Sequence, residues 1–136
     1  RRSNLTVEEF RIEYEARNIP VIITDVVQNW GAYGSWDLDY LRKAFQGSSV
    51  IVGDAPMTFE AYITYCERQH DEAPLYLFDK GFCDKAPAMA REYEVPRYFQ
   101  EDLFSVLGED DRPDYRWLIY GPAKSGSTFH KDPNAT

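Results

Sequence analysis

Three runs rich in β-branched, aromatic and other large apolar residues most constrain how this chain of 136 residues can fold. They cover residues 21–27, 75–79 and 115–120, and Pro20 opens the first of them. Residues of these types favour the pleated, half-buried environment of a strand, so each run predicts a strand. We expect these strands to form a β core that carries helical decoration.

Three stretches show the apolar periodicity of short helices, and each begins with a residue that can cap a helix. Residues 4–17 carry Thr6 and Glu9 at the spacing of a capping box, in which each residue satisfies a backbone N–H at the helix start. We expect Asp37 to cap a second helix and Thr58 to cap a third.

The remaining stretches are assigned from the glycine, proline and charged residues that bound them. A short strand is expected at 50–52, closed by the glycine and proline residues that follow it. We predict a short helix at 101–107, a solvated acidic turn at 109–113, and a final strand at 127–132.

Composition places the chain among folded globular proteins and excludes two classes of partner. Hydrophobic residues make up 43% of the chain and aromatic residues 15%, which is enough for a packed core. The net charge of −8 and the pI near 4.7 argue against a grip on nucleic acid phosphates and against a polybasic membrane anchor. An acidic surface would attract a basic protein or peptide substrate.

The two cysteines, Cys66 and Cys83, cannot complete a structural zinc site by themselves. We expect two reduced thiols in an intracellular protein, with Cys66 on the apolar face of the third helix. His70 follows that helix, where it can be a remote metal ligand, contact the helix C-terminus or simply be exposed.

A histidine and an aspartate stand two residues apart near the end of the chain, at His130 and Asp132. On an extended strand these two side chains point to the same face, and Lys131 points to the other. An imidazole and a carboxylate in this arrangement are two of the three ligands of the facial triad that binds non-haem Fe(II). The same spacing is common on solvated strands, so the motif alone leaves both readings open.

The stretch 121–128 also approaches the pattern of a phosphate-binding P-loop, but two requirements fail. Ser127 stands where the P-loop needs a lysine to reach the phosphates. A P-loop must also open a helix, whereas a strand-like stretch and Pro133 follow here. We therefore interpret 121–126 as a connection between strands.

Four blocks in order along the chain, 74–79, 98–104, 112–117 and 121–133, resemble the JmjC-domain oxygenases. They are most similar to the branch that contains the bifunctional arginine demethylase and lysyl-hydroxylase and the related F-box JmjC proteins. The resemblance implies a mainly β cupin fold, a double-stranded β-helix or JmjC jelly roll with N-terminal helical decoration. It covers only the N-terminal part of such a domain, so we expect this truncated stretch to read as α+β.

The resemblance also implies one incomplete domain over residues 1–136. Residues 1–110 would form its N-terminal helix and strand region, and residues 111–136 would supply the first core strands with the histidine–aspartate motif. The chain begins with two arginines rather than methionine, and we expect it to be part of a longer protein.

The resemblance implies Fe(II) as the metal and 2-oxoglutarate as the co-substrate. His130 and Asp132 match iron ligands, while Tyr76 and Ser127 match residues that contact 2-oxoglutarate. Strict strand alternation would instead put Thr128 on the His130 face, and Ser127 would need a local bulge to reach it. Without the resemblance, Tyr76 reads equally well as a core aromatic.

The implied activity is that of a nuclear or cytoplasmic protein oxygenase. It would hydroxylate a lysyl side chain or demethylate an N-methyl group in a protein such as a histone or an RNA-processing factor. The family's third iron ligand and a lysine that pairs with 2-oxoglutarate have no counterpart among these residues, so we expect this segment alone to be inactive. Two alternatives remain: a JmjC-like adaptor without catalysis, and a different cupin metalloenzyme that acts on a small molecule.

Overall fold

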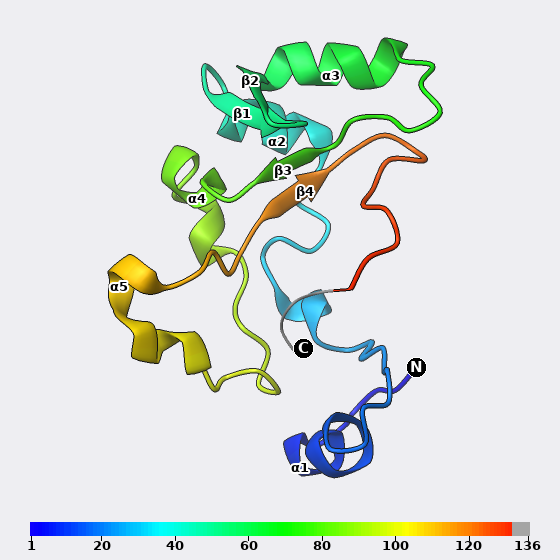
Figure 1. The fold of residues 1–136 in the computed structure, drawn as a ribbon, viewed down its shortest axis with the longest axis vertical. Helices are drawn as coiled ribbons and strands as arrows, with labels where there is room; N and C mark the ends of the chain where they lie inside the picture. The colour runs from blue at the N-terminus through cyan, green and yellow to red at the C-terminus, as the bar shows by residue number, and fades with distance from the viewer. Residues whose placement is uncertain (132–136) are drawn as a thin grey trace. The chain divides into compact units, whose positions relative to one another are not determined.

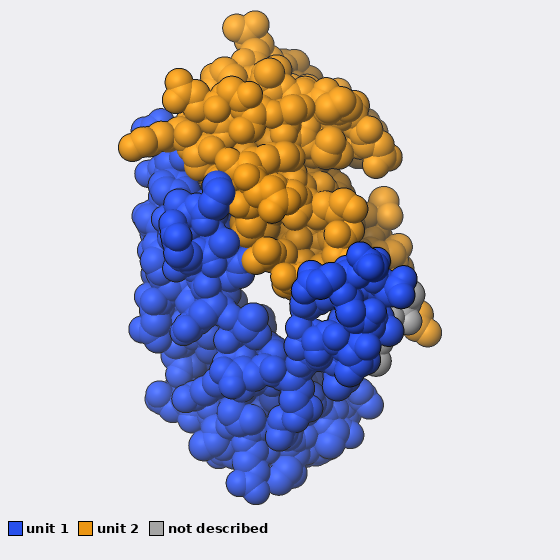
Figure 2. Space-filling model, turned by 90° about the vertical axis from the view of Figure 1, so that its left-hand side faces the viewer, with its two compact units in different colours: residues 1–40, 87–113 blue, residues 41–86, 114–136 orange. Residues whose placement is uncertain are grey.

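The computed structural model describes residues 1–131 and divides into two compact units (Figure 2). The first unit comprises residues 1–40 and 87–113, and the second comprises residues 41–86 and 114–136. Each unit is therefore formed by two separate segments of the chain. None of the helices in residues 1–131 is long and apolar enough to cross a membrane.

The first unit begins with α1 (Val7–Phe10), which continues as a π-helical turn over Arg11–Glu15. The hydroxyl of Thr6 accepts a hydrogen bond from the Glu9 N–H at 3.1 Å, and the Glu9 carboxylate accepts one from the Thr6 N–H at 2.8 Å. The predicted helix and its capping box are confirmed.

A small buried cluster of Leu5, Phe10 and Tyr98 ties the start of the first unit to its second segment. The rings of Phe10 and Tyr98 lie 5.3 Å apart, and the Tyr98 hydroxyl donates to the Leu5 carbonyl at 2.6 Å. The guanidinium of Arg97 donates to the same carbonyl at 2.8 Å. Packing and hydrogen bonding therefore converge on one point of the backbone.

Glu92 forms a second anchor in this unit. Its carboxylate accepts hydrogen bonds from the Trp36 indole at 2.6 Å and from the Tyr40 hydroxyl at 2.7 Å. These two donors lower the pKa of the Glu92 carboxyl group. Partial burial, together with the nearby carboxylate, raises the pKa of Tyr40 to about 12.

The predicted strand at 21–27 is wrong. The structure has only an isolated parallel bridge between Arg2 and Ile23 there, followed by a 3-10 turn at Val27–Asn29. A strand requires a neighbour with several free backbone groups, and this run pairs with the backbone of a single residue, Arg2. Val21, Ile23 and Val26 of this run are instead half-buried against the Leu5 cluster, while Ile22 and Val27 are exposed.

The end of the first unit is more helical than its composition suggests. Short 3-10 helices occupy Met89–Arg91 and Leu103–Leu107, the second inside the predicted helix at 101–107. The acidic stretch predicted as a turn contains α5 (Gly108–Asp111). Its carboxylates lie in the first helical turn, where they favour the helix because they face the positive end of its dipole.

The second unit is built on a four-stranded antiparallel sheet with the order β2-β1-β3-β4 (Figure 1). Its strands are β1 (Ser49–Val52), β2 (Ala55–Thr58), β3 (Leu77–Asp79) and β4 (Leu118–Tyr120). The predicted strands at 50–52, 75–79 and 115–120 are confirmed, although the last two are shorter than expected.

Two further differences concern this sheet. The prediction missed β2, which pairs with β1 across a tight turn whose residues Gly53 and Asp54 both have positive φ, 52° and 66°. That is the conformation of a two-residue hairpin. In the predicted strand at 127–132, the described residues 127–131 form no strand because they make no ladder with the rest of the sheet, and Asp132 lies outside the described residues.

Three helices complete the second unit. α2 (Leu38–Ala44) begins at the end of the first unit, and the Asp37 carboxylate accepts the Tyr40 N–H at 2.8 Å, as the capping prediction requires. α3 (Phe59–Arg68) buries an apolar face, and α4 (Phe82–Lys85) is a single turn. The largest fully buried side chains of this unit are Phe45, Val50, Val52, Tyr62, Ile63, Leu77 and Asp79.

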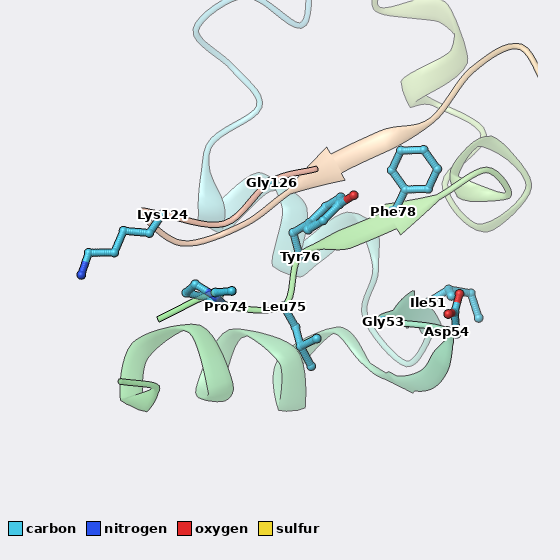
Figure 3. A pocket seen from close by; sticks show the side chains of 10 residues that line it. Ile51, Gly53, Asp54, Pro74, Leu75, Tyr76, Phe78, Lys124 and Gly126 are labelled. Carbon is cyan, nitrogen blue, oxygen red and sulfur yellow. The ribbon is translucent and has the colours of Figure 1, made fainter. Parts of the chain in front are cut away.

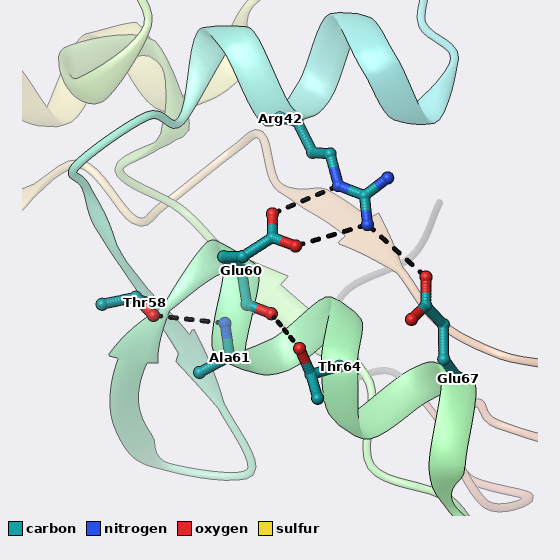
Figure 4. A network of polar contacts seen from close by, with 6 residues as sticks. All are labelled: Arg42, Thr58, Glu60, Ala61, Thr64 and Glu67. Carbon is teal, nitrogen blue, oxygen red and sulfur yellow. Dashed lines mark hydrogen bonds and ion pairs between the residues drawn. The ribbon is translucent and has the colours of Figure 1, made fainter.

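α3 is fixed at its start and along its exposed face (Figure 4). The Thr58 hydroxyl accepts the Ala61 N–H at 3.2 Å, which confirms the predicted cap. From α2, the Arg42 guanidinium binds the carboxylates of Glu60 at 3.1 Å and Glu67 at 3.4 Å. Each exposed ion pair adds little stability by itself, but together they link α2 to two positions along α3.

Asp79 at the end of β3 is the one charged residue among the fully buried side chains of the described residues. Its carboxylate accepts the Gly81 N–H at 2.8 Å and forms an ion pair with Lys85 of α4. A buried carboxylate needs such partners because its desolvation is otherwise strongly unfavourable. The pair therefore fixes the turn between β3 and α4.

The cap of α3 gives the first prediction. Replacing Thr58 by alanine leaves the Ala61 N–H without its acceptor and should lower the free energy of unfolding by about 1 kcal/mol. Replacing it by serine keeps a hydroxyl in the same place and should preserve most of the stability. Urea unfolding of the two variants measures the difference, and equal losses in both would contradict the capping role.

The Tyr40–Glu92 contact predicts a pH dependence. The folded-state pKa of about 12 exceeds the ordinary value of 10, so between these pH values the unfolded state releases this proton first. Stability should therefore fall as pH rises through this window. Tyr40→Phe should reduce that fall, whereas Tyr33→Phe, at an exposed position, should leave it unchanged. Unfolding experiments across the window that give parallel curves for wild type and Tyr40→Phe would contradict the assignment.

Candidate functional site

The second unit contains an open hollow of about 370 Å³ beside the sheet (Figure 3). Its walls come from the β1–β2 hairpin, from the segment between α3 and β3, from β3 itself and from the loop after β4. The lining residues are Ile51, Gly53, Asp54, Ala73, Pro74, Leu75, Tyr76, Phe78, Lys124 and Gly126. Polar and apolar groups contribute to this wall in similar measure, with Asp54, Tyr76 and Lys124 among them.

Tyr76 stands in this wall immediately before β3 and is half-buried. Its ring contacts the edge of Phe78, with centroids 6.1 Å apart, and Phe78 stacks on Trp117 at 5.6 Å. A half-buried ring that contacts Phe78 fits both readings of Tyr76, as a core aromatic and as a ligand contact. Tyr76 and Phe78 share a face because they are two residues apart in an extended segment, which the sequence pattern could have indicated.

The loop at 121–126 approaches Tyr76 closely because Gly121 has no side chain. A Cβ atom at this position would lie 2.9 Å from the Tyr76 Cβ and would overlap the Ser125 hydroxyl. Ser125 closes the turn by donating from its hydroxyl to the Pro122 carbonyl at 2.7 Å. Lys124 has a positive φ of 73° and, as Figure 3 shows, its side chain extends away from Tyr76.

Ser127 follows Gly126, the last lining residue of the hollow, and its side chain is exposed. Thr128 is exposed as well. Residues 127–131 are not in a strand, so the alternation of side chains along a strand does not apply to them. It therefore does not decide whether the Ser127 or the Thr128 hydroxyl would face a ligand. The assignment of Ser127 stays a prediction.

His130 is exposed, and one of its ring nitrogens lies close to the backbone of a neighbouring residue. Its Nδ1 lies 2.7 Å from the carbonyl oxygen of Thr128. A carbonyl oxygen can only accept, so Nδ1 donates in this contact, and a neutral ring in this tautomer has its lone pair on Nε2. A metal-bound histidine commonly has this arrangement, with one nitrogen hydrogen-bonded and the other on the metal.

A neutral imidazole fits Fe(II), so His130 is chemically suited to be one ligand. Asp132, the other predicted metal ligand, lies outside the described residues. Among residues 1–131 no group of three histidine, cysteine or acidic side chains is placed to hold a metal ion. His70, considered as a remote ligand, belongs to no such group and is exposed.

The cysteines are placed in the interior of the second unit rather than at the hollow. Cys83 is buried, Cys66 is half-buried on α3, and neither forms a disulfide. Burial raises the pKa of the Cys66 thiol, which disfavours the reactive thiolate. Both observations agree with a packing role.

No family model matches the chain. Curated relatives do match it along its whole length. It is 46% identical to the arginine-specific demethylase JMJ22 of Arabidopsis thaliana, with 100% of the chain and 28% of that protein covered. It is 37% identical to the bifunctional arginine demethylase and lysyl-hydroxylase psr-1 of Caenorhabditis elegans, with 98% and 36% covered.

A more distant relative carries the cofactors in its name. The 2-oxoglutarate and iron-dependent oxygenase JMJD4 of Homo sapiens is 28% identical, with 85% of the chain and 34% of that protein covered. The chain thus spans about a third of the length of these relatives or less.

The close approach at Gly121 gives the third prediction. Gly121→Ala should lower the free energy of unfolding by about 1–3 kcal/mol, because the new methyl group meets Tyr76 and Ser125. Adding Ser125→Ala removes one of the two collisions and should restore part of the loss. Unfolding of the single and double variants measures this coupling, and a Gly121→Ala variant as stable as wild type would contradict the packing.

Proposed function

This chain belongs to the JmjC family, and we propose that the protein containing it is an Fe(II)- and 2-oxoglutarate-dependent oxygenase that acts on a protein substrate. The observation that carries the proposal is similarity along the whole chain to relatives named as demethylases, as a lysyl-hydroxylase and as a 2-oxoglutarate and iron-dependent oxygenase. An α+β segment with an antiparallel sheet is compatible with this membership.

We propose further that residues 1–136 are part of one cupin domain. In this account residues 1–110 form its N-terminal region, and residues 111–136 begin the jelly roll and deliver the metal ligands. The short antiparallel strands β3 and β4 support the proposal, since a jelly roll is built from such strands.

His130 and Asp132 are the proposed iron ligands. The contact of His130 Nδ1 with the Thr128 carbonyl supports the first assignment, because it leaves Nε2 as the nitrogen that a metal ion would bind. When bound, the iron supplies the oxidative chemistry, which no amino-acid side chain can provide by itself. This segment alone, with two of the expected ligands, is proposed to be inactive.

Tyr76 and Ser127 are the proposed contacts of 2-oxoglutarate. The position of Tyr76 in the wall of the hollow supports its assignment, because its hydroxyl can donate to a carboxylate there.

The proposed substrates are proteins with basic segments. The relatives' names include arginine demethylation and lysyl hydroxylation, and an acidic chain of net charge −8 attracts such segments electrostatically. A histone or an RNA-processing factor fits this description, and a nuclear location belongs to the same proposal.

The whole protein should consume 2-oxoglutarate when Fe(II) and oxygen are present. His130→Ala and Asp132→Ala should each abolish this turnover because each removes an iron ligand. His70→Ala, at the other histidine of the chain, is the matched control and should retain wild-type turnover.

Succinate formation measured on the iron-loaded wild type and the three variants decides the matter. A wild-type protein that binds Fe(II) but forms no succinate would contradict the oxygenase proposal and favour a JmjC-like adaptor. Equal losses in His70→Ala and His130→Ala would contradict the assignment of the site.

A further inference from the structure

The segment that carries Tyr76 is held from α3 by two tyrosine hydroxyls. Tyr62 and Tyr65 lie about one turn apart on α3, and their rings stack with centroids 6.2 Å apart. The Tyr65 hydroxyl accepts the backbone N–H of Leu75 at 2.9 Å, and the Tyr62 hydroxyl accepts that of Leu77 at 3.1 Å. The residues on both sides of Tyr76 are therefore fixed by the same helix.

Tyr62 also joins β3 to β4. Its side chain is fully buried, and its hydroxyl donates to the Tyr120 carbonyl at 2.8 Å, with the Leu75 carbonyl a more distant acceptor at 3.3 Å. Leu77 and Tyr120 are paired residues in the β3–β4 ladder. The hydroxyl thus bridges an amide and a carbonyl at the end of that ladder, beside Tyr76.

The Tyr65 hydroxyl has a second hydrogen-bond partner, the carboxylate of Asp71. The hydroxyl donates to this carboxylate at 2.6 Å, which leaves an oxygen lone pair to receive the Leu75 N–H. The same carboxylate raises the pKa of the Tyr65 hydroxyl, so the hydroxyl stays protonated and able to donate. For Tyr62, burial and the nearby Cys66 thiol raise the pKa in the same direction.

These bonds determine where the Tyr76 side chain points. In an extended segment alternate residues share an orientation, so anchoring the amides of Leu75 and Leu77 leaves Tyr76 little freedom to rotate about the segment axis. Leu77 is buried beneath the sheet, and the intervening Tyr76 ring stands in the wall of the hollow (Figure 3). α3, itself capped by Thr58 and bound by Arg42, is the fixed support.

We propose that Tyr62 and Tyr65 are positioning residues that hold Tyr76 in place to contact the co-substrate. The inference rests on the proposed function, since it assigns these two hydroxyls to the 2-oxoglutarate contact of Tyr76. Neither tyrosine lines the hollow, so both act through the backbone on either side of Tyr76.

The kinetic test uses three single variants of the whole protein, Tyr62→Phe, Tyr65→Phe and Tyr76→Phe. It also uses two double variants, in which Tyr76→Phe is combined with Tyr62→Phe or with Tyr65→Phe. Each of the first two single variants should raise KM for 2-oxoglutarate about two- to tenfold with kcat nearly unchanged, as expected when the single hydrogen bond between Tyr76 and the co-substrate is weakened or lost. In the Tyr76→Phe background neither change should raise KM further. Tyr40→Phe, which loses a hydroxyl bond to Glu92 elsewhere, is the matched control and should keep the wild-type KM.

A purely structural role would give a different pattern. The KM effects of Tyr62→Phe and Tyr65→Phe would then persist in the Tyr76→Phe background, or appear equally in Tyr40→Phe, and either result overturns the proposal. Tyr65 is half-buried, so Tyr65→Phe still decides the question if the fully buried Tyr62→Phe does not fold.

A second readout does not depend on turnover. Amide hydrogen exchange at Leu77 should accelerate about tenfold or more in Tyr62→Phe. Amide hydrogen exchange at Leu75 should accelerate by a similar factor in Tyr65→Phe. The NMR signals of the Tyr76 ring should shift in both variants. Unchanged exchange and ring signals overturn the positioning role, whatever the kinetics. If the wild type does not turn over 2-oxoglutarate, the proposed function is wrong, but the positioning of Tyr76 by α3 is not thereby contradicted. The amide exchange rates and the Tyr76 ring signals still test that positioning.

Discussion

The second unit depends on the hydrogen bonds that the buried Tyr62 hydroxyl makes with the backbone of Leu77 and Tyr120. The strands β3 and β4 are short, with three paired positions, so the end of their ladder needs support from elsewhere. One side chain from α3 satisfies a donor and an acceptor there in a water-excluded place, where leaving either unpaired would be strongly unfavourable. The hollow, the Tyr76 ring and the loop at 121–126 all lie against this junction.

Features that depend on neighbours in the sequence were predicted well. The capping box of Thr6 and Glu9 and the caps at Asp37 and Thr58 are all present, because a cap is a contact over three or four residues. The strand at 21–27 was wrong and β2 was missed for the opposite reason. A strand exists only where another segment offers a ladder, and single-residue composition does not contain that information.

The candidate site was only partly predictable. The residue types and spacing at His130 and Asp132 indicated a metal site, and the resemblance to JmjC oxygenases drew attention to Tyr76, which does line a hollow. The proposed roles of Tyr62 and Tyr65 could not be predicted, since helical periodicity marks Tyr62 only as a member of an apolar face and does not single out Tyr65. Their hydroxyl bonds to Leu75 and Leu77 depend on how α3 packs on the sheet.

The central claim is that this chain contributes a histidine and a carboxylate to an iron centre next to a co-substrate site at Tyr76. Anomalous diffraction at the iron edge, from crystals of the whole protein loaded with Fe(II) and 2-oxoglutarate without oxygen, tests it most directly. The account predicts one iron peak within bonding distance of His130 and Asp132, with a 2-oxoglutarate carboxylate at the Tyr76 hydroxyl. An iron bound elsewhere, or a co-substrate remote from Tyr76, would contradict it.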